Sequence, residues 1–306
     1  MCKICKTKPI IQLTNTNISL CKSCFLKYFE KKTFKTIKKY DLIEKNDKIL
    51  VAISGGKDSL TVLNILNKLR ERLLFKIEAL LIDEGIKNYR GITIIDAKNF
   101  CKKNNIKLTI VSFKKEFKYP LDSLIKKINL KPCTVCGVLR RYLLNKYSKK
   151  LKATKLVTGH NLDDEAQSIL MNQFKHNIEI SARLGPITGV ISDKKFIKRI
   201  KPLYLLNEKE TATYAYLNNF NSKYVECPYT IDSYRNEVRD MLNNFENKYP
   251  GTKHAIVNSF LDILPLLKDK YKTNKKIISC KKCKEPSSKE YCQACEILRM
   301  VGIHKS

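Results

Sequence analysis

VAISGGKDS, residues Val51–Ser59, joins an apolar run to the start of an amphipathic segment. Ser54, Gly55 and Gly56 allow backbone N–H groups to point at an anion without interference from a Cβ atom. A helix that begins here adds the positive end of its dipole, and Lys57 adds a mobile positive charge. The stretch therefore predicts a phosphate-binding loop between a buried strand and a helix.

Asp58 and Ser59 complete this loop and restrict the class of nucleotide-binding loop to which it can belong. A carboxylate beside a phosphate implies a bridging Mg²⁺ ion, so the loop predicts magnesium together with a nucleotide. The loop is not a Walker A sequence, because only Ser54 separates the strand from the paired glycines. The Walker pattern requires four residues between its two glycines.

Short apolar strands alternate with helices from Lys48 onward. This alternation predicts an α/β fold, a doubly wound parallel sheet with helices on both faces. Ligands of such sheets bind at the carboxyl ends of the strands. From Asn207 the chain is expected to be mainly helical. The expected strands are residues 48–54, 76–83, 107–113 and 154–161, and the expected helices are residues 58–73, 92–105, 134–151, 163–176, 207–220, 233–249 and 252–267.

The composition restricts the class of partner. The 306 residues include 60 Lys and Arg against 29 Asp and Glu, for a formal net charge of +31. This excess indicates a polyanionic partner, and a hydrophobic content of 43% still allows a packed core. No apolar run approaches the roughly 20 residues of a membrane span, and the N-terminal MCKICKTKPI has no apolar signal segment. We therefore expect a cytoplasmic protein whose cysteines are metal ligands or reactive thiols.

Eight of the 12 cysteines form CxxC pairs near the two ends of the chain. The two pairs are separated by 15 residues at the N-terminal end and by 8 residues at the C-terminal end. Two CxxC pairs complete a four-thiolate zinc site, so we predict two zinc ions. The alternative is that the pairs are free thiols that recur by chance. The eight residues are Cys2, Cys5, Cys21, Cys24, Cys280, Cys283, Cys292 and Cys295.

The four other cysteines do not form a structural zinc site. Cys101 lies in an amphipathic stretch and is expected to pack as a small buried hydrophobic residue. Cys133 and Cys136 stand in KPCTVCGVLRR, and Cys227 stands in VECPYT. Three cysteines are too few for a structural zinc ion but suit an open site that leaves one coordination position for a substrate.

Two lysine-rich stretches are candidates for contact with a polyanion. Residues 27–46 are expected to form a basic amphipathic helix, for which a solvated face is as good an interpretation as RNA contact. Residues 268–289 hold nine lysines and lead into the second CxxC array. We expect three parts: an N-terminal zinc finger (residues 1–28), a catalytic domain (residues 29–270) and a C-terminal zinc finger (residues 271–306).

The motifs together resemble one family. SGGKDS is similar to the signature of the PP-loop ATP pyrophosphatases, which cleave ATP to AMP and pyrophosphate. The full arrangement resembles the TtuA/NcsA/cytosolic thiouridylase family, whose members replace the C2 oxygen of a tRNA uridine with sulfur. Besides the CxxC arrays and the phosphate loop, the resemblance rests on Leu80–Ile86 (LLIDEGI), Pro132–Arg141 (PCTVCGVLRR), Thr158–Gln167 (TGHNLDDEAQ) and Glu226–Tyr229 (ECPY).

The resemblance implies an activity, cofactors and partners. The expected enzyme is an ATP-dependent tRNA sulfurtransferase in which Cys133, Cys136 and Cys227 bind a 4Fe-4S cluster. Persulfide and disulfide chemistry on two of these cysteines is the alternative. The implied sulfur donor is sulfide or a thiocarboxylated ubiquitin-like carrier protein, and a homodimer is possible. Neither the donor nor the modified uridine, at the wobble position or in the T-loop, follows from the sequence.

The resemblance also implies roles for single residues. The loop from Ser54 to Ser59 would hold the β- and γ-phosphates. Arg140 would neutralise the α-phosphate, although some relatives have Lys there. Asp164 is the better match to the family's catalytic carboxylate, and Asp163 is the other candidate; helix capping is the plainer role for both. Contact with the adenosine through backbone atoms is expected at the strand ends, with core packing as the alternative for the first two residues: Ala52, Ile82 and Gly159.

Two rival functions follow from the same motifs. The first is an RNA-binding zinc protein with a non-catalytic ATP site, which the intact residues Gly55–Ser59 disfavour. The second is another PP-loop tRNA modifier such as a lysidine synthetase, whose amine nucleophile gives no reason for three internal cysteines. An ATP-dependent amidotransferase would require a glutaminase domain, for which this chain has no room.

Overall fold

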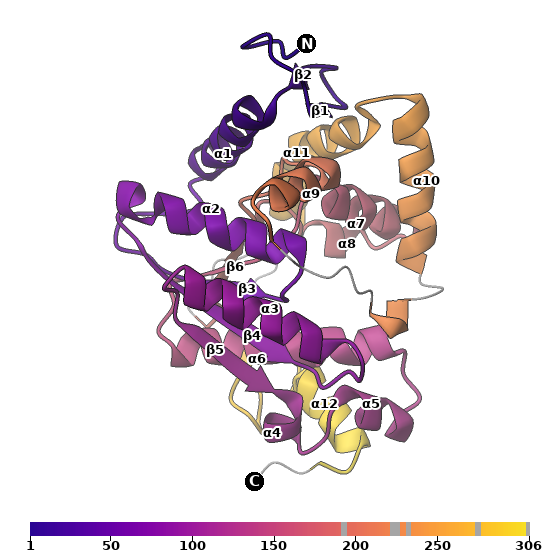
Figure 1. Ribbon diagram of the computed structural model, residues 1–306. Helices are drawn as coiled ribbons and strands as arrows, with labels where there is room; N and C mark the ends of the chain where they lie inside the picture. Colours follow the sequence, from indigo (N-terminus) through magenta and orange to yellow (C-terminus); the bar gives the residue numbers. More distant parts are fainter. Residues whose placement is uncertain (191–194, 221–226, 231–233, 273–276, 304–306) are drawn as a thin grey trace.

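A six-stranded, mostly parallel sheet forms the centre of the computed structural model, which describes residues 1–190, 195–220, 227–230, 234–272 and 277–303 (Figure 1). The strand order is β5-β4-β3-β6-β8-β7, and only the pairing of β7 with β8 is antiparallel within this sheet. The strands are β3 (Lys48–Ile53), β4 (Lys76–Asp83), β5 (Leu108–Ser112), β6 (Lys155–Val157), β7 (Ile187–Thr188) and β8 (Lys198–Ile200). The parallel order confirms the expected α/β class.

Helices cover the sheet (Figure 1). The longer helices are α1 (Lys22–Lys39), α2 (Lys57–Leu73), α3 (Arg90–Lys103), α6 (Pro132–Lys150), α7 (Leu162–Phe174), α9 (Glu208–Leu217), α10 (Tyr234–Lys248), α11 (Thr252–Lys270) and α12 (Gln293–Met300). The short helical segments are α4 (Phe113–Phe117), α5 (Leu121–Leu124), η1 (Ile125–Lys127), α8 (Ile178–Ser181) and η2 (Pro228–Thr230). Two small antiparallel ribbons are β1 (Ile11–Gln12) with β2 (Ser19–Leu20), and β9 (Ile278–Ser279) with β10 (Pro286–Ser287).

The two faces of the sheet bury different hydrophobic clusters. Side chains alternate along β3, so Ile49 and Val51 pack with helices α1 and α2 while Leu50 packs with α6 and α12. Burial on both faces explains why the central strands are continuous apolar runs. A third cluster joins α7, α10 and α11, which confirms the mainly helical region expected after Asn207.

Several sequence predictions differ from the structure. The basic helix expected over 27–46 is α1, which begins at Lys22, directly after Cys21, and ends at Lys39. The predicted boundary between residues 28 and 29 therefore falls inside α1. Strands β7 and β8 were not expected, because two- and three-residue strands carry no readable alternation.

The two terminal modules lie at opposite ends of the molecule (Figure 1). The C-terminal module packs through Ile297 and Leu298 of α12 into the cluster that contains Leu139 and Leu143 of α6. Lys149 of α6 also pairs with Glu285 at 2.9 Å. In the described part of the chain, every helix is too short or too polar to cross a membrane.

Candidate active site and cysteine centres

The SGGKDS loop turns sharply at the carboxyl end of β3. Gly55 adopts φ +85°, and a Cβ atom there would lie 2.1 Å from the Thr93 carbonyl oxygen, so only glycine fits. The backbone N–H of Ser54 donates to Ser59 Oγ at 3.1 Å, and Ser59 Oγ donates to the Gly56 carbonyl at 2.9 Å. These bonds hold the loop open at the start of α2, as phosphate binding requires.

Gly159 follows β6 and lies against the same loop. A Cβ atom at Gly159 would lie 2.9 Å from both the carbonyl carbon and the carbonyl oxygen of Asp58. The predicted nucleotide-contact residue therefore touches the first turn of α2. Ala52 and Ile82 lie in β3 and β4, where both pack in the cluster around α6. Their predicted contact with adenosine stays a prediction.

Replacing Gly159 by alanine should lower AMP formation by about 10- to 100-fold. The added methyl group must push the Asp58 carbonyl away, and misplacement of a reacting group by about 1 Å has an effect of this size. Gly91→Ala in α3 is the matched control, because a Cβ atom there has nothing within 4 Å. Steady-state AMP release with saturating tRNA measures both variants, and equal activity of the two would contradict the assigned role of Gly159.

A carboxylate-rich group surrounds Lys57. Its ammonium lies 3.1 Å from Asp58 Oδ2 and 2.9 Å from Glu208 Oε1, and Asn161 Nδ2 donates to Asp58 Oδ1 at 3.3 Å. Burial opposes the charge of Lys57, but Asp58 and Glu208 outweigh it and raise the pKa of the ammonium. Burial raises the pKa of Asp58; Lys57 opposes this rise and Asp164 adds to it. Crowded oxygen ligands of this kind suit Mg²⁺.

The structure separates the two candidate aspartates. Asp163 is buried, forms an ion pair with Lys253 and accepts a hydrogen bond from the Glu208 backbone N–H at 2.7 Å. Both carboxylate oxygens of Asp163 are thus used inside the protein. Asp164 forms a capping box with Asn161 at the start of α7, and its Oδ1 lies 3.6 Å from Arg235 Nη1. The Asp164 side chain is 33% exposed and that of Asp163 only 6%, so the geometry favours Asp164 as the catalytic candidate.

An ionic chain centred on the buried Glu84 connects the loop to the cysteines. Glu84, which is fully buried, pairs with Arg90 through one oxygen and with Arg140 Nε through the other at 2.7 Å. Arg90 Nη1 donates to the Ser54 carbonyl at 2.8 Å. Arg140 Nη2 donates to Cys136 Sγ at 3.1 Å. Arg140 is therefore placed beside the cysteine site.

Cys133, Cys136 and Cys227 meet at the start of α6. Cys133 Sγ donates to the Tyr229 carbonyl at 3.3 Å, and Cys136 and Cys227 belong to the same hydrophobic cluster. Burial raises the pKa of Cys227, and the charge of Cys133 raises it further, whereas Arg140 opposes the rise. Glu226 of the ECPY motif lies outside the described residues.

The spacing of these three sulfurs restricts the kind of metal centre that they can hold. Among the described residues, the groups of ligand atoms that all lie within 4.8 Å of one another are the two terminal sets of four cysteines. The three central thiols are thus too widely spaced for a single tetrahedral ion, whose sulfur ligands lie about 3.8 Å apart.

The terminal cysteines form two compact groups that can each hold a metal ion. Cys5 Sγ lies 3.4 Å from Cys21 Sγ and 3.6 Å from Cys24 Sγ, and Cys283 Sγ lies 3.6 Å from Cys292 Sγ. These distances approach the edge of a tetrahedral four-thiolate site. Cys101, by contrast, is buried in the core, and burial raises the pKa of its thiol to about 11, in agreement with a packing role.

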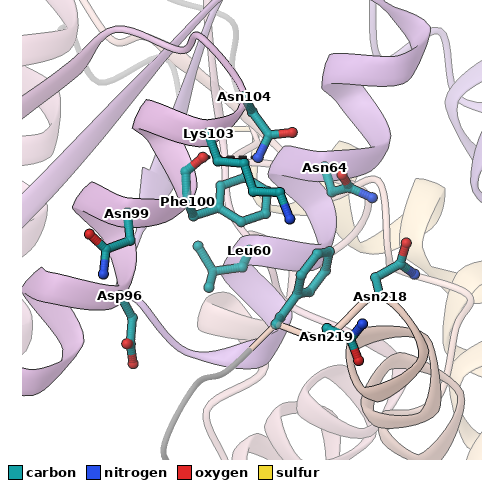
Figure 2. Close-up of a pocket in the computed structure, with 10 residues that line it drawn as sticks. Leu60, Asn64, Asp96, Asn99, Phe100, Lys103, Asn104, Asn218 and Asn219 are labelled. Carbon is teal, nitrogen blue, oxygen red and sulfur yellow. Dashed lines mark hydrogen bonds between the residues drawn. The ribbon is translucent and has the colours of Figure 1, made fainter.

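A separate cavity of about 390 Å³ lies between α2, α3 and the end of α9 (Figure 2). Leu60 and Phe100 form part of its apolar wall, and Asn64, Asn99 and Asn219 contribute amide groups. None of the predicted site residues lines it. The cavity is therefore distinct from the phosphate loop and the cysteine centre.

Glu84, Arg90 and Glu208 are site residues that sequence reasoning missed. Glu84 lies in the LLIDEGI motif, where a carboxylate after an apolar strand was a usable signal. Glu208 carries no such signal, because acidic residues are ordinary in the first turn of a helix. Arg90 carries none, because it lies outside the motifs named above.

A phosphate loop at the carboxyl edge of a parallel sheet, with adjacent metal-type thiols, defines a nucleotide-binding protein of the PP-loop class. A family profile described as "PP-loop domain" matches residues 26–245. The chain belongs to the TtuA/NcsA/cytosolic thiouridylase family within that class.

Three relatives illustrate the family. A protein named "Probable sulfurtransferase" from Methanocaldococcus jannaschii is 39% identical, with 92% of this chain and 83% of the relative covered. The "tRNA-5-methyluridine(54) 2-sulfurtransferase" of Pyrococcus horikoshii is 37% identical, with 96% and 92% covered. The solved structure of the U34-tRNA thiolase NcsA from Methanococcus maripaludis, with its 4Fe-4S cluster, is 33% identical, covers 100% of this chain and 97% of its own, and superposes with a TM-score of 0.86.

Proposed function

We propose that this chain is a cytoplasmic, ATP-dependent tRNA uridine 2-sulfurtransferase. The observation that carries the proposal is the placement of three cysteines next to a PP-loop, with Cys136 connected to the Ser54 carbonyl through three charged side chains. The names of the relatives agree with it, since both sulfurtransferase and tRNA thiolase occur among them. A non-catalytic ATP site would not need this connection.

The proposed reaction has two steps, adenylation of the uridine and replacement of its C2 oxygen by sulfur. The C2 oxygen of the uridine attacks the α-phosphorus of ATP, and the bond to the pyrophosphate breaks with its electron pair. The carbonyl oxygen thereby becomes part of a phosphate ester, a far better leaving group. Sulfide then adds to C2, and AMP departs with the former carbonyl oxygen, which leaves a C2 thiocarbonyl after loss of the sulfide proton. No oxidant is needed.

The phosphate loop and its carboxylates perform the first step. The N–H groups of Gly55 to Ser59 would hold the β- and γ-phosphates at the positive end of α2. Lys57 stabilises the charge that develops on the pyrophosphate. Asp58 and Asp164 would hold Mg²⁺, in agreement with their crowding. Arg140, adjacent to the cysteines, would neutralise the α-phosphate as its charge rearranges.

Cys133, Cys136 and Cys227 would hold a 4Fe-4S cluster. With three protein thiolates as ligands, the cluster would supply a position for sulfide in the second step. Cys136 is buried, and burial raises the pKa of its thiol, whereas the hydrogen bond from Arg140 opposes this rise. Zinc is proposed for both terminal groups of four cysteines. The sulfur donor remains either sulfide or a ubiquitin-like carrier, and a homodimer stays a prediction.

The decisive experiment combines two readouts on one reaction. Anaerobically prepared protein is incubated with ATP, Mg²⁺, sulfide and unmodified tRNA. Pyrophosphate release that depends on tRNA excludes a binding-only protein, and 2-thiouridine in the nucleoside digest excludes a lysidine-type reaction. Control tRNAs carry cytidine at position 34 or at position 54, because the relatives name both positions. If 2-thiouridine is lost with only one control tRNA, the position changed in that tRNA is the modified base. Absence of 2-thiouridine from the tRNA that carries both uridines contradicts the proposal.

Binding of tRNA should weaken steeply with salt, because positive side chains displace counterions from phosphates. Lys284 and Lys289 are exposed on the C-terminal module, whereas Lys281 pairs with Glu290. The double change Lys284→Ala and Lys289→Ala should lower the slope of log K against log salt by up to about 2. Filter binding at several salt concentrations measures the slope.

Point substitutions are preferable to removal of residues 271–306. Helix α12 completes the core around α6, so truncation would expose that cluster. Lys98→Ala with Lys102→Ala on α3 is the matched control for total charge. An equal slope for the two double variants would argue against RNA contact by the C-terminal module.

A further inference from the structure

The ionic chain between the phosphate loop and Cys136 includes two residues, Glu84 and Arg90, that have no role in either chemical step as written. It contains Arg90, Glu84 and Arg140, and it begins at the Ser54 carbonyl. The centre of this chain is costly to bury, because the Arg90 guanidinium and the Glu84 carboxylate must lose water, whereas the Arg140 side chain is 45% exposed. Glu84 is fully buried and serves both arginines, one with each oxygen. A specific arrangement kept at this cost points to a function beyond packing.

Arg90 holds the phosphate loop in shape. Its Nη1 donates to the Ser54 carbonyl and its Nη2 to the Ile82 carbonyl, both at 2.8 Å, while Nε pairs with Glu84. The Ser54 carbonyl belongs to the peptide whose N–H is that of Gly55. Because the peptide group is planar, a fixed carbonyl also fixes the direction of that N–H group. Arg90 therefore orients a donor of the predicted phosphate site.

Arg140 forms the other end of the chain. Its Nε lies 2.7 Å from Glu84, and its Nη2 donates to Cys136 Sγ at 3.1 Å. Burial opposes its charge, but Glu84 and Cys136 outweigh burial and raise the pKa of the guanidinium. The position of this guanidinium over Cys136 thus depends on how firmly Glu84 is held. Glu84 in turn is held by Arg90.

We infer that Glu84 and Arg90 are positioning residues that couple nucleotide binding at the PP-loop to the state of Cys136. A bound triphosphate aligns the Gly55 N–H and so locks the Ser54 carbonyl onto Arg90. Arg90 then holds Glu84, and Glu84 holds Arg140 over the Cys136 sulfur. The inference rests on the proposed function for its purpose, which is to keep the sulfur site closed until the uridine can be adenylated.

Thiol labelling tests this coupling without tRNA, sulfur or a cluster. Iron-free, full-length protein is treated with N-ethylmaleimide, with and without saturating α,β-methylene ATP, and labelling is followed by peptide mass spectrometry. In the unchanged protein the nucleotide should change the labelling rate of Cys136 at least about fivefold, the lower end of ordinary coupling between sites. Cys133 lies on the same peptide but bonds to the Tyr229 carbonyl, so its rate should change less than twofold.

Two variants should remove the nucleotide effect. In Glu84→Gln the neutral amide cannot pair with two guanidinium groups, and in Arg90→Lys one ammonium cannot reach both Glu84 and the Ser54 carbonyl. For each, the nucleotide should change the Cys136 rate less than twofold, with nucleotide binding measured separately to ensure saturation. Arg90→Lys provides the readout if Glu84→Gln does not fold.

Glu165→Gln is the matched control, because Glu165 forms a buried pair with Lys201 at 2.6 Å away from this chain. It should lose stability and keep the fivefold effect. The inference is overturned if the unchanged protein shows no effect, if both thiols respond equally, or if the variants keep the full effect. Failure of tRNA thiolation would overturn the proposed function, but the labelling result would still test the coupling between the nucleotide and Cys136.

Discussion

Replacing Lys57 or Asp58 by alanine should lower AMP and pyrophosphate formation at least about 100-fold while the protein remains folded. Lys57 is the mobile charge of the phosphate loop, and Asp58 is the first carboxylate that a bridging Mg²⁺ would meet. Removal of one preorganised group that stabilises transition-state charge has an effect of about 100- to 1,000-fold. Both reactions are measured as tRNA-dependent pyrophosphate release.

The two variants should differ in their magnesium dependence. Asp58→Ala should require a higher Mg²⁺ concentration for its residual activity, whereas Lys57→Ala should not. Lys68→Ala is the matched control, since Lys68 lies on the same helix and forms a surface pair with Glu30 at 2.6 Å. Near-normal pyrophosphate release by both loop variants would refute the assignment of the loop.

Cys227→Ala should lose cluster iron and tRNA thiolation together, with thiolation reduced at least about 100-fold. Cys227 lies 91 positions after Cys136 in the sequence. It nevertheless packs in the same hydrophobic cluster as Cys136, and the charge of Cys133 contributes to raising the pKa of its thiol. With two ligands instead of three, the cluster site is incomplete. Iron and sulfide analysis after anaerobic purification, with nucleoside mass spectrometry, measures both losses.

The controls for Cys227→Ala separate the cluster from the rest of the molecule. Zinc content and tRNA binding should persist, because the terminal groups have four thiols each without Cys227. Cys101→Ala should change neither iron nor thiolation, since Cys101 is buried in the core. A Cys227 variant with full iron and normal thiolation would favour the persulfide scheme on Cys133 or Cys136.

Much of the site could be predicted from local sequence. Gly55 and Gly56 next to an apolar strand signal a loop that requires positive φ and close backbone approach, and Gly55 has both. The CxxC pairs predicted the two terminal groups, because two cysteines three positions apart converge on one ion wherever the chain folds. The strand–helix alternation predicted the parallel sheet, since burial on both faces makes each strand a distinct apolar run.

Other parts depended on contacts between distant segments. The sequence left both aspartates as candidates, with Asp164 the better match to the family, and only Lys253 and the start of α9 show that Asp163 is used internally. The C-terminal module was expected to be separate, and only the packing of α12 shows that it completes a core. The domain division stays a prediction.

The sequence by itself determined the phosphate loop, the sheet and the metal-type cysteine groups, because short-range spacing and backbone geometry specify each of them. Tertiary structure alone decided that Glu84 joins Arg90 to Arg140 and that Cys136 lies at the end of that chain. Which charged side chains pair across the fold depends on which helix ends lie next to each other. The periodicity of the sequence does not encode these contacts. The connection between the nucleotide loop and the sulfur site is therefore a property of packing.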